Sequence, residues 1–247
     1  MAARAGQPDS SPLVPFGPLI AAVVVAVLAG GTQEVRALLG RMTRWRVHPA
    51  WCPVVVLAPF VADAVAGGLA VAAGAPHPRA EAYPDLLTIG GTLLSTIAIV
   101  GLFEEVGWRG FALPRLQRHH DALSAALMLG VIWALWHLPE LISDPTGQRP
   151  PVQFVLCVIA QSVIFTWLYN RTNGSLPIVI LFHAAINTAG RLMLQSFPED
   201  QWETAWWARV ATYGIVAVTV TIHGGKTLTT ANPRQALPAE RVTHPTP

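Results

Sequence analysis

The sequence predicts an all-α integral membrane protein, a polytopic bundle of about seven transmembrane helices in one domain. Of the 247 residues, 52% are hydrophobic and only 12% are charged, about half the usual charged share of a soluble domain. The mean hydropathy is +0.44, and apolar runs of about twenty residues, the length that spans a bilayer, recur along the chain. The expected surroundings are therefore lipid, and the net charge of +2 is too small to indicate a nucleic-acid partner.

Polar turns divide the chain into seven apolar segments. Residues 1–12 are polar and are predicted to be a flexible N-terminus. Basic residues follow the first apolar segment rather than precede it, which favours a retained helix over a signal peptide. Residues 224–247 are rich in threonine and proline and predict a disordered tail, so the membrane domain is assigned to residues 13–223. The predicted spans are residues 13–30, 51–73, 85–117, 121–141, 151–169, 175–195 and 205–223.

Basic turns alternate with neutral or acidic ones along the whole chain. Residues 36–46 contain four arginines and are interpreted as an amphipathic segment at the cytoplasmic interface. The turns at residues 115–120 and 170–174 are also basic, whereas residues 198–203 are acidic. Basic loops of membrane proteins stay in the cytoplasm. The pattern therefore predicts a multi-pass protein of the cell membrane with its N-terminus outside and its C-terminus in the cytoplasm.

Two adjacent carboxylates, Glu104 and Glu105, end the apolar part of the third segment. One charged side chain at the centre of a bilayer costs roughly 2.5–3.5 kcal/mol on insertion scales, so such residues mark functional sites. Glu105 and Arg109 are four residues apart, which predicts an ion pair on one helix face. A structural ion pair and a direct catalytic role are both compatible with this spacing.

Two histidines and an asparagine lie in later apolar segments at comparable depths. Glu104 precedes the turn residue His119 by 15 residues, and His137 follows it by 18. In an antiparallel hairpin these distances bring the carboxylates level with His137. His183 and Asn187 are four residues apart and share one helix face. The sequence therefore predicts that these groups meet in a polar cavity inside the membrane.

These residue types suit peptide hydrolysis, and two mechanisms remain open. In the first, a desolvated Glu104 acts as a base toward water that His137 shares, while His183 and Asn187 bind the oxyanion. In the second, Glu104, His137 and His183 hold a zinc ion with water as the fourth ligand. Arg109 is interpreted as the partner that neutralises and orients the carboxylates. No cofactor other than this zinc is indicated.

Three motifs resemble those of the CAAX protease and bacteriocin-processing (CPBP, or Abi) family of intramembrane endopeptidases, in its bacterial branch. They are Glu104-Glu105-x-x-x-Arg109, an aromatic residue one turn before His137, and His183-x-x-x-Asn187, in the family's order between about residues 86 and 193. The resemblance implies that Glu104 and His137 activate water and that His183 and Asn187 bind the oxyanion. Members are similar to enzymes that trim the last three residues from prenylated CAAX proteins, and the family is commonly labelled metalloprotease. Trp133 stands where the family often has phenylalanine, and the region before the motifs is shorter, as though one or two leading helices were absent.

The predicted function is therefore an intramembrane endopeptidase that acts on a peptide or protein substrate near the membrane. A non-catalytic membrane module, such as a bacteriocin-immunity or scaffold protein, is one alternative. A transporter that uses Glu104 and Glu105 as a proton relay is the other. His183 and Asn187 favour hydrolysis, because a proton relay does not need an oxyanion site.

Overall fold

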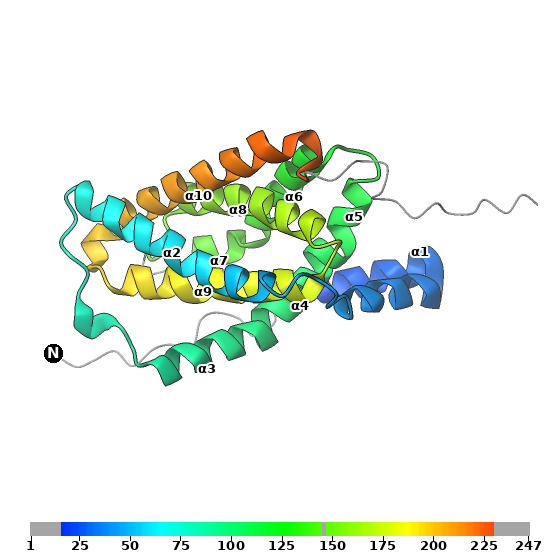
Figure 1. Cartoon of the computed structure of the whole chain (residues 1–247), viewed down its shortest axis with the longest axis horizontal. Helices are drawn as coiled ribbons and strands as arrows, with labels where there is room; N and C mark the ends of the chain where they lie inside the picture. Colours follow the sequence, from blue (N-terminus) through cyan, green and yellow to red (C-terminus); the bar gives the residue numbers. More distant parts are fainter. Residues whose placement is uncertain (1–15, 145–146, 230–247) are drawn as a thin grey trace, which may run out of the picture.

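Most of the long helices run side by side in an elongated bundle (Figure 1). The structure is a computed structural model that describes residues 16–144 and 147–229. The predicted flexible N-terminus and residues 230–247 of the predicted tail lie outside the described residues. Within the described part of the chain there is no strand.

The α-helices are listed first, in chain order. They are α1 (Gly17–Met42), α2 (Trp51–Ala72), α3 (Leu86–Thr96), α4 (Leu102–Glu105), α5 (Leu113–Leu116), α6 (Ala122–Trp136), α7 (Leu138–Ser143), α8 (Pro151–Arg171), α9 (Leu176–Gln195) and α10 (Trp202–Gly224). Two π-helical segments, η2 (Ile97–Gly101) and η3 (Val106–Ala112), join α3, α4 and α5 into one span. Three short 3-10 turns are η1 (Ala80–Ala82), η4 (Glu199–Gln201) and η5 (Gly225–Thr227).

Seven helical stretches among the described residues are long and apolar enough to cross a membrane. This confirms the predicted all-α, polytopic fold. Five of the stretches, the second to the sixth, begin and end within two residues of the predicted spans. The last one runs from Glu199 to Thr227 and is longer than predicted at both ends. The positions of the turns were therefore readable from polar residues and from the glycines and prolines between apolar runs.

The first predicted span, residues 13–30, ends at a break inside α1. The stretch α1 consists of two helices that meet at Gly30 and Gly31, where the backbone is not helical. Gly31 has a φ of +60°, a conformation that glycine adopts without the steric cost of a Cβ atom. A second helix follows this break and contains Arg36 and Arg41. Pro18 of the first helix lies against Gly107 and Leu38 of the second lies against Gly110, so the second helix folds back along the first. The guanidinium of Arg41 donates a hydrogen bond to the carbonyl of Gly110 in η3, at 2.8 Å.

Aspartates set the start of the third and fourth spans. Asp85 accepts a hydrogen bond from the backbone N–H of Thr88 at 2.7 Å, and Asp121 accepts one from Ser124 at 2.9 Å. Both are N-caps that satisfy an otherwise unpaired N–H of the first turn. These backbone hydrogen bonds favour the ionised carboxylate and lower the pKa of Asp85 and of Asp121 below the usual value.

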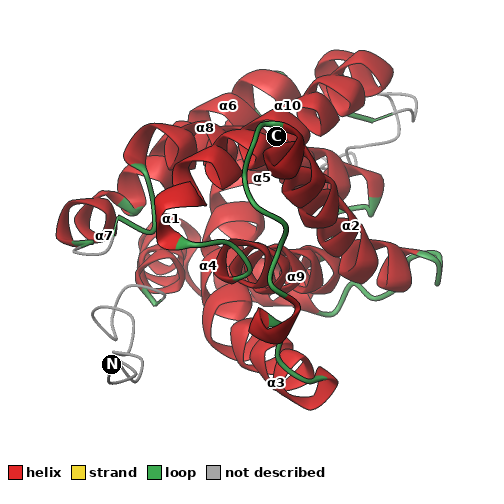
Figure 2. Cartoon of the chain, turned by 90° about the vertical axis from the view of Figure 1, so that its left-hand side faces the viewer, coloured by secondary structure: helices red, strands yellow, loops and turns green. Residues whose placement is uncertain are grey.

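Helix α9 lies near the centre of the bundle, and α3 lies at its edge. Viewed along the bundle, α9 is surrounded by α2, α4 and α8, whereas α3 stands apart at the rim (Figure 2). In the most apolar 18-residue window of each span, 78% of the residues are buried for α9, against 6% for the span that begins with α3. The residues of α9 therefore face other helices on nearly every side, and α9 is the element that can bring side chains from several spans together.

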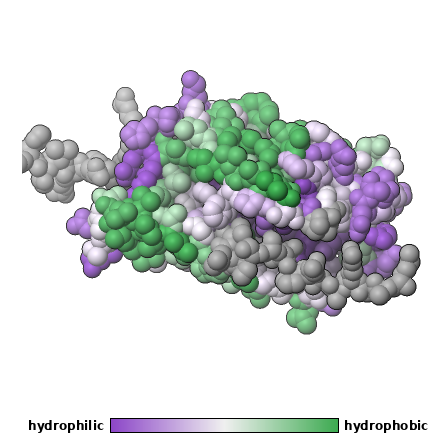
Figure 3. Space-filling view, turned by 180° about the vertical axis from the view of Figure 1, so that it is seen from behind, coloured by the Kyte–Doolittle hydropathy of each residue, from purple (hydrophilic) through white to green (hydrophobic). Residues whose placement is uncertain are grey.

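Apolar side chains cover much of the outer surface, as expected for a protein in lipid. On the face shown in Figure 3 they form broad areas, and hydrophilic residues gather mainly toward the two ends of the long axis.

The chain that follows α10 packs in part against the rest of the protein. Within the stretch assigned to the tail, Leu228 is fully buried, and the carbonyl of Thr227 accepts a hydrogen bond from Asn170 at 3.2 Å.

Candidate active site

The third span is interrupted by π-helical turns on both sides of the two glutamates. Helix α4 ends at Glu105, between η2 and η3. A π-helical turn adds a residue to the turn and shifts the direction of the side chains, and such turns are frequent at functional sites. The local sequence is rich in glycine here. A Cβ atom on Gly107 would lie 2.5 Å from the backbone of Pro18, so only glycine allows α1 to pack this closely behind the glutamates.

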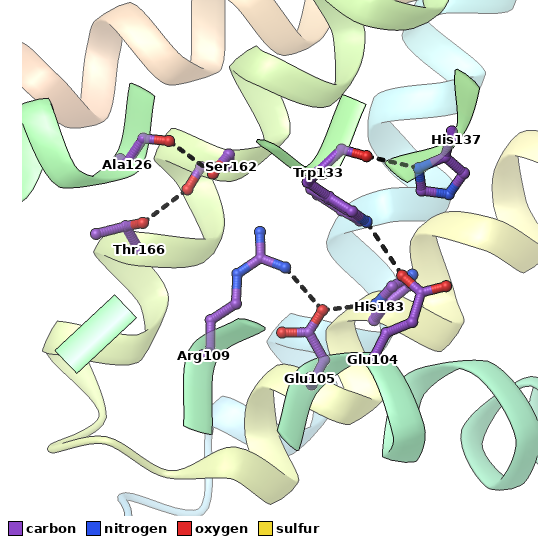
Figure 4. Close-up of polar contacts among 9 residues, drawn as sticks. All are labelled: Glu104, Glu105, Arg109, Ala126, Trp133, His137, Ser162, Thr166 and His183. Atoms are coloured by element: carbon purple, nitrogen blue, oxygen red, sulfur yellow. Dashed lines mark hydrogen bonds and ion pairs between the residues drawn. The ribbon is translucent and has the colours of Figure 1, made fainter. Parts of the chain in front are cut away.

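Glu105 is the centre of a buried ion-pair cluster. Its Oε1 atom lies 2.8 Å from Nη1 of Arg109 and 2.7 Å from Nδ1 of His183 (Figure 4). Glu105 and Arg109 are fully buried, and His183 is 3% exposed. The predicted Glu105–Arg109 pair is therefore present. The structure also brings His183 of α9 onto the same carboxylate oxygen, which joins the third span to the sixth.

The guanidinium of Arg109 lies between two aromatic rings. Its Cζ atom is 4.4 Å from the ring centre of Trp133 and 4.2 Å from that of Phe165. A cation over an aromatic face is attracted by the ring quadrupole, more strongly when water is excluded. Nε and Nη2 of Arg109 are buried and have no hydrogen-bond partner among the described residues. The charge of Arg109 is thus held by Glu105 and the two rings.

Glu104 points away from this ion pair and toward α6. Its Oε2 atom accepts a hydrogen bond from the indole N–H of Trp133 at 3.1 Å. One turn further along the chain, Nδ1 of His137 lies 2.8 Å from the carbonyl oxygen of Trp133. Glu104 and His137 therefore both border Trp133 (Figure 4). The ring of Trp133 also packs edge to face against His183, with 5.5 Å between ring centres.

The structure brings five of the six predicted residues into this connected arrangement. Glu105, Arg109 and His183 form the ion-pair cluster, and Glu104 and His137 are joined to it through Trp133. Asn187 lies one turn after His183 on α9 but is exposed. All six residues are described, and no hydrogen bond links Asn187 to any of the others. Its expected pairing with His183 is therefore not seen as a direct contact.

The zinc alternative does not fit the arrangement of these side chains. Among the described residues, no group of three His, Cys, Asp or Glu side chains is placed to hold a metal ion. Glu104, His137 and His183 instead bond to Trp133, to its carbonyl oxygen and to Glu105. We therefore derive no step of the chemistry through zinc.

Sequence reasoning missed two features. The first is Trp133, which was singled out only as an aromatic residue before His137 but donates to Glu104 and stacks on Arg109. The second is a buried cluster between α2 and α10, in which Asp63 lies 2.6 Å from Nε of Arg209 and accepts a hydrogen bond from Tyr213 at 3.0 Å. The signal for this second cluster was available, because Asp63 and Arg209 are charged residues inside apolar segments.

The site lies within a segment that matches a known family. Residues 87–189, which contain all six predicted site residues, match the family described as Type II CAAX prenyl endopeptidase Rce1-like. The chain is also similar to the CAAX prenyl protease 2 of Methanococcus maripaludis, with 28% identity over 109 residues. That alignment covers 41% of this chain and 40% of the relative, so the chain aligns with about two fifths of the length of that curated relative. The family resemblance noted from the three motifs is confirmed by these matches.

Proposed function

Because residues 87–189 match the Type II CAAX prenyl endopeptidase family, we propose that this multi-pass membrane protein is an intramembrane peptidase. Its substrate is a peptide or protein at the membrane, and the bond that it hydrolyses lies near the substrate's C-terminus, where CAAX sequences occur. The observation that carries the proposal is the buried contact of Glu105 in the third span with His183 in the sixth, beside Glu104, which is joined to this pair through Trp133.

Glu104 is the general base in this proposal. Trp133 engages its Oε2 atom, which leaves Oε1 to bind water. Glu104 takes a proton from that water as its oxygen attacks the carbonyl carbon of the scissile peptide bond. The same carboxyl group then gives the proton to the leaving nitrogen as the C–N bond breaks, and the products are a new carboxylate and a free amine. His137, which borders the same tryptophan, is the second group that orients the water.

His183 is the residue that stabilises the oxyanion. Its Nδ1 atom lies 2.7 Å from Oε1 of Glu105, and an N–H···O hydrogen bond there fixes the orientation of the ring. Nε2 is then the atom that faces substrate and donates to the developing negative charge when the ring is protonated. Arg109 pairs with the same oxygen of Glu105 and so fixes the carboxylate that orients His183. Asn187 is exposed one turn away, so its amide is accessible to a substrate as a second donor.

Replacing Glu104 tests the proposal with little change in shape. Glu104→Gln keeps an oxygen that accepts from Trp133 but removes the base. A general base contributes typically 10²–10⁴-fold to a rate, so we expect a loss of at least about 100-fold in hydrolysis of a farnesylated CAAX peptide. The measurement is product formation by purified protein in detergent, followed by mass spectrometry. Glu199→Gln, which changes an exposed carboxylate in η4, is the matched control and is expected to retain full activity.

A near wild-type rate for Glu104→Gln would remove Glu104 from the mechanism. A wild-type protein that cleaves no CAAX peptide, farnesylated or not, would contradict the proposed activity itself.

A further inference from the structure

The exposed residues of α9 are all polar and lie on one strip of the helix. Every residue of α9 is described, and the exposed ones are Asn187, Arg191 and Gln195, each four positions from the next. The other residues of α9 are buried or half-buried. A polar strip with an arginine would be costly against lipid. The strip therefore borders a space that water reaches, and it leads from His183 toward the C-terminal end of α9.

This strip opens into a polar groove between α9 and the N-terminal half of α3. The groove has a volume of about 400 Å³. From α9 it is lined by Thr188 and Arg191, and from the other side by Glu81, Tyr83, Thr88 and Thr92. Figure 2 shows the two helices that border it, with α3 at the rim of the bundle and α9 nearer its centre. No residue of this groove belongs to the Glu105 cluster, so it is a separate feature one to two turns along α9.

A buried threonine with an unpaired hydroxyl group lines this groove. Thr188 lines it and is only 1% exposed, and its Oγ1 atom has no hydrogen-bond partner among the described residues. Most buried polar side-chain atoms are hydrogen-bonded, and each exception needs an explanation. A ligand with backbone N–H and C=O groups in the groove would supply the missing partner. The unpaired hydroxyl is thus independent of the exposed strip and also indicates a polar ligand.

The distance along α9 fits a short extended peptide. Eight residues separate His183 from Arg191, which corresponds to about 12 Å at a rise of about 1.5 Å per residue. An extended peptide advances about 3.3 Å per residue. About three residues beyond a scissile bond at His183 would therefore place the end of the peptide at Arg191.

We propose that the α3–α9 groove binds the part of the substrate that follows the scissile bond, and that Arg191 binds its terminal carboxylate. This inference rests on the proposed peptidase function and adds the recognition of a free C-terminus. A guanidinium has five N–H donors and binds a carboxylate through two of them, so a partner within the protein leaves donors for the substrate. The hydroxyl of Thr188 and the carboxylate of Glu81 are available to the peptide backbone.

Two peptides that differ only at the C-terminus test this assignment. Both end in an S-farnesylated cysteine, two aliphatic residues and methionine, and one carries a free carboxylate where the other carries an amide. The shared farnesyl group makes their partition into detergent the same. Binding of each fluorescent peptide to the purified full-length protein is measured by anisotropy, and hydrolysis is measured separately. We expect the wild type to bind the carboxylate form on the order of tenfold more tightly, as for loss of a hydrogen bond to a charged group.

Three variants locate the effect. Arg191→Gln is expected to bind both peptides with Kd values within about twofold of each other, because the charged partner is gone. Arg191→Lys is expected to keep part of the preference, since it keeps the charge but not the two-pronged geometry. Arg118→Gln removes an exposed arginine of another turn and is expected to match the wild type.

The groove assignment is overturned if Arg191→Gln keeps the full preference, or if the wild type binds the two peptides equally or binds neither. The outcome for the proposed function is read separately. A wild type that prefers the carboxylate through Arg191 but hydrolyses nothing supports the groove and contradicts the peptidase. A wild type that hydrolyses both peptides equally well supports the peptidase and contradicts the groove.

Discussion

At the scale of single residues, Arg109 is the charge on which the buried cluster depends. It is fully buried and lies 2.8 Å from Glu105. Arg109→Ala would leave Glu105 as a buried charge without its cation, which costs about 3–5 kcal/mol in comparable pairs. We therefore expect a lower Tm in detergent and lower activity together. The double variant Glu105→Gln with Arg109→Ala is expected to recover part of the Tm, because the unpaired charge is removed.

A half-exposed ion pair provides the control for Arg109. Arg115 pairs with Glu34, and their side chains are 28% and 35% exposed. Exposed pairs contribute about 0–1 kcal/mol, so Arg115→Ala is expected to change the Tm little. If Arg109→Ala were as stable as the wild type, the Glu105–Arg109 pair would not hold the site together.

Only part of the site could be predicted from the sequence. The spacing of Glu105 and Arg109 by four residues predicts their contact, because helix geometry fixes which residues share a face. The number of residues between the turn and each of Glu104 and His137 predicted that the two lie at a similar depth in the membrane. Such a count does not give the direction in which a side chain points. The contact of Glu105 with His183, and of Glu104 with Trp133, depends on how the spans turn about their axes. The two π-helical segments shift that direction in the third span, and no pattern in the residues indicated them.

At the scale of elements, a second buried cluster joins α2 to α10. Asp63 lies 2.6 Å from Arg209 and accepts a hydrogen bond from Tyr213, and all three are buried. The guanidinium also packs against α9, since a Cβ atom on Gly190 would lie 2.4 Å from Nη2 of Arg209. The cluster therefore fixes both helices against the element that carries His183.

Breaking this cluster on one side is expected to destabilise the bundle. Arg209→Leu leaves Asp63 buried and unpaired, and the expected cost is about 3–5 kcal/mol. The double variant Asp63→Leu with Arg209→Leu is expected to be more stable than Arg209→Leu alone, because the isolated charge is gone. Thermal unfolding in detergent measures both. A double variant that is less stable than Arg209→Leu would mean that Asp63 contributes to the fold through some other contact.

The spans themselves were more predictable than their ends. Apolar length sets how much helix a membrane requires, and this fixed the seven stretches. The predicted end of the first span at residue 30 coincides with the break at Gly30 and Gly31. The second helix of α1 follows this break and packs on the third span, where Arg41 donates a hydrogen bond to the carbonyl of Gly110. No pattern in the residues indicated that contact.

At the scale of the whole molecule, the arrangement of charged turns predicts the orientation in the membrane. Basic and neutral or acidic turns alternate between the seven spans, and the positive-inside rule therefore predicts a cytoplasmic C-terminus. A reporter fused after Lys226 is expected to be active in the cytoplasm, and one inserted near Pro198 is expected to be external. A cytoplasmic signal from both sites would mean that Trp202–Gly224 does not cross the membrane.

The proposed reaction is hydrolysis of a peptide bond by water at the buried Glu104, Glu105 and His183. Hydrolysis in H₂¹⁸O measures it most directly, because the oxygen of the attacking water enters the new carboxylate. We expect the purified wild type to release a peptide whose new C-terminus carries ¹⁸O, and Glu104→Gln to release on the order of 1% as much or less. Equal release of labelled product by wild type and Glu104→Gln, or no labelled product from the wild type, would contradict the account.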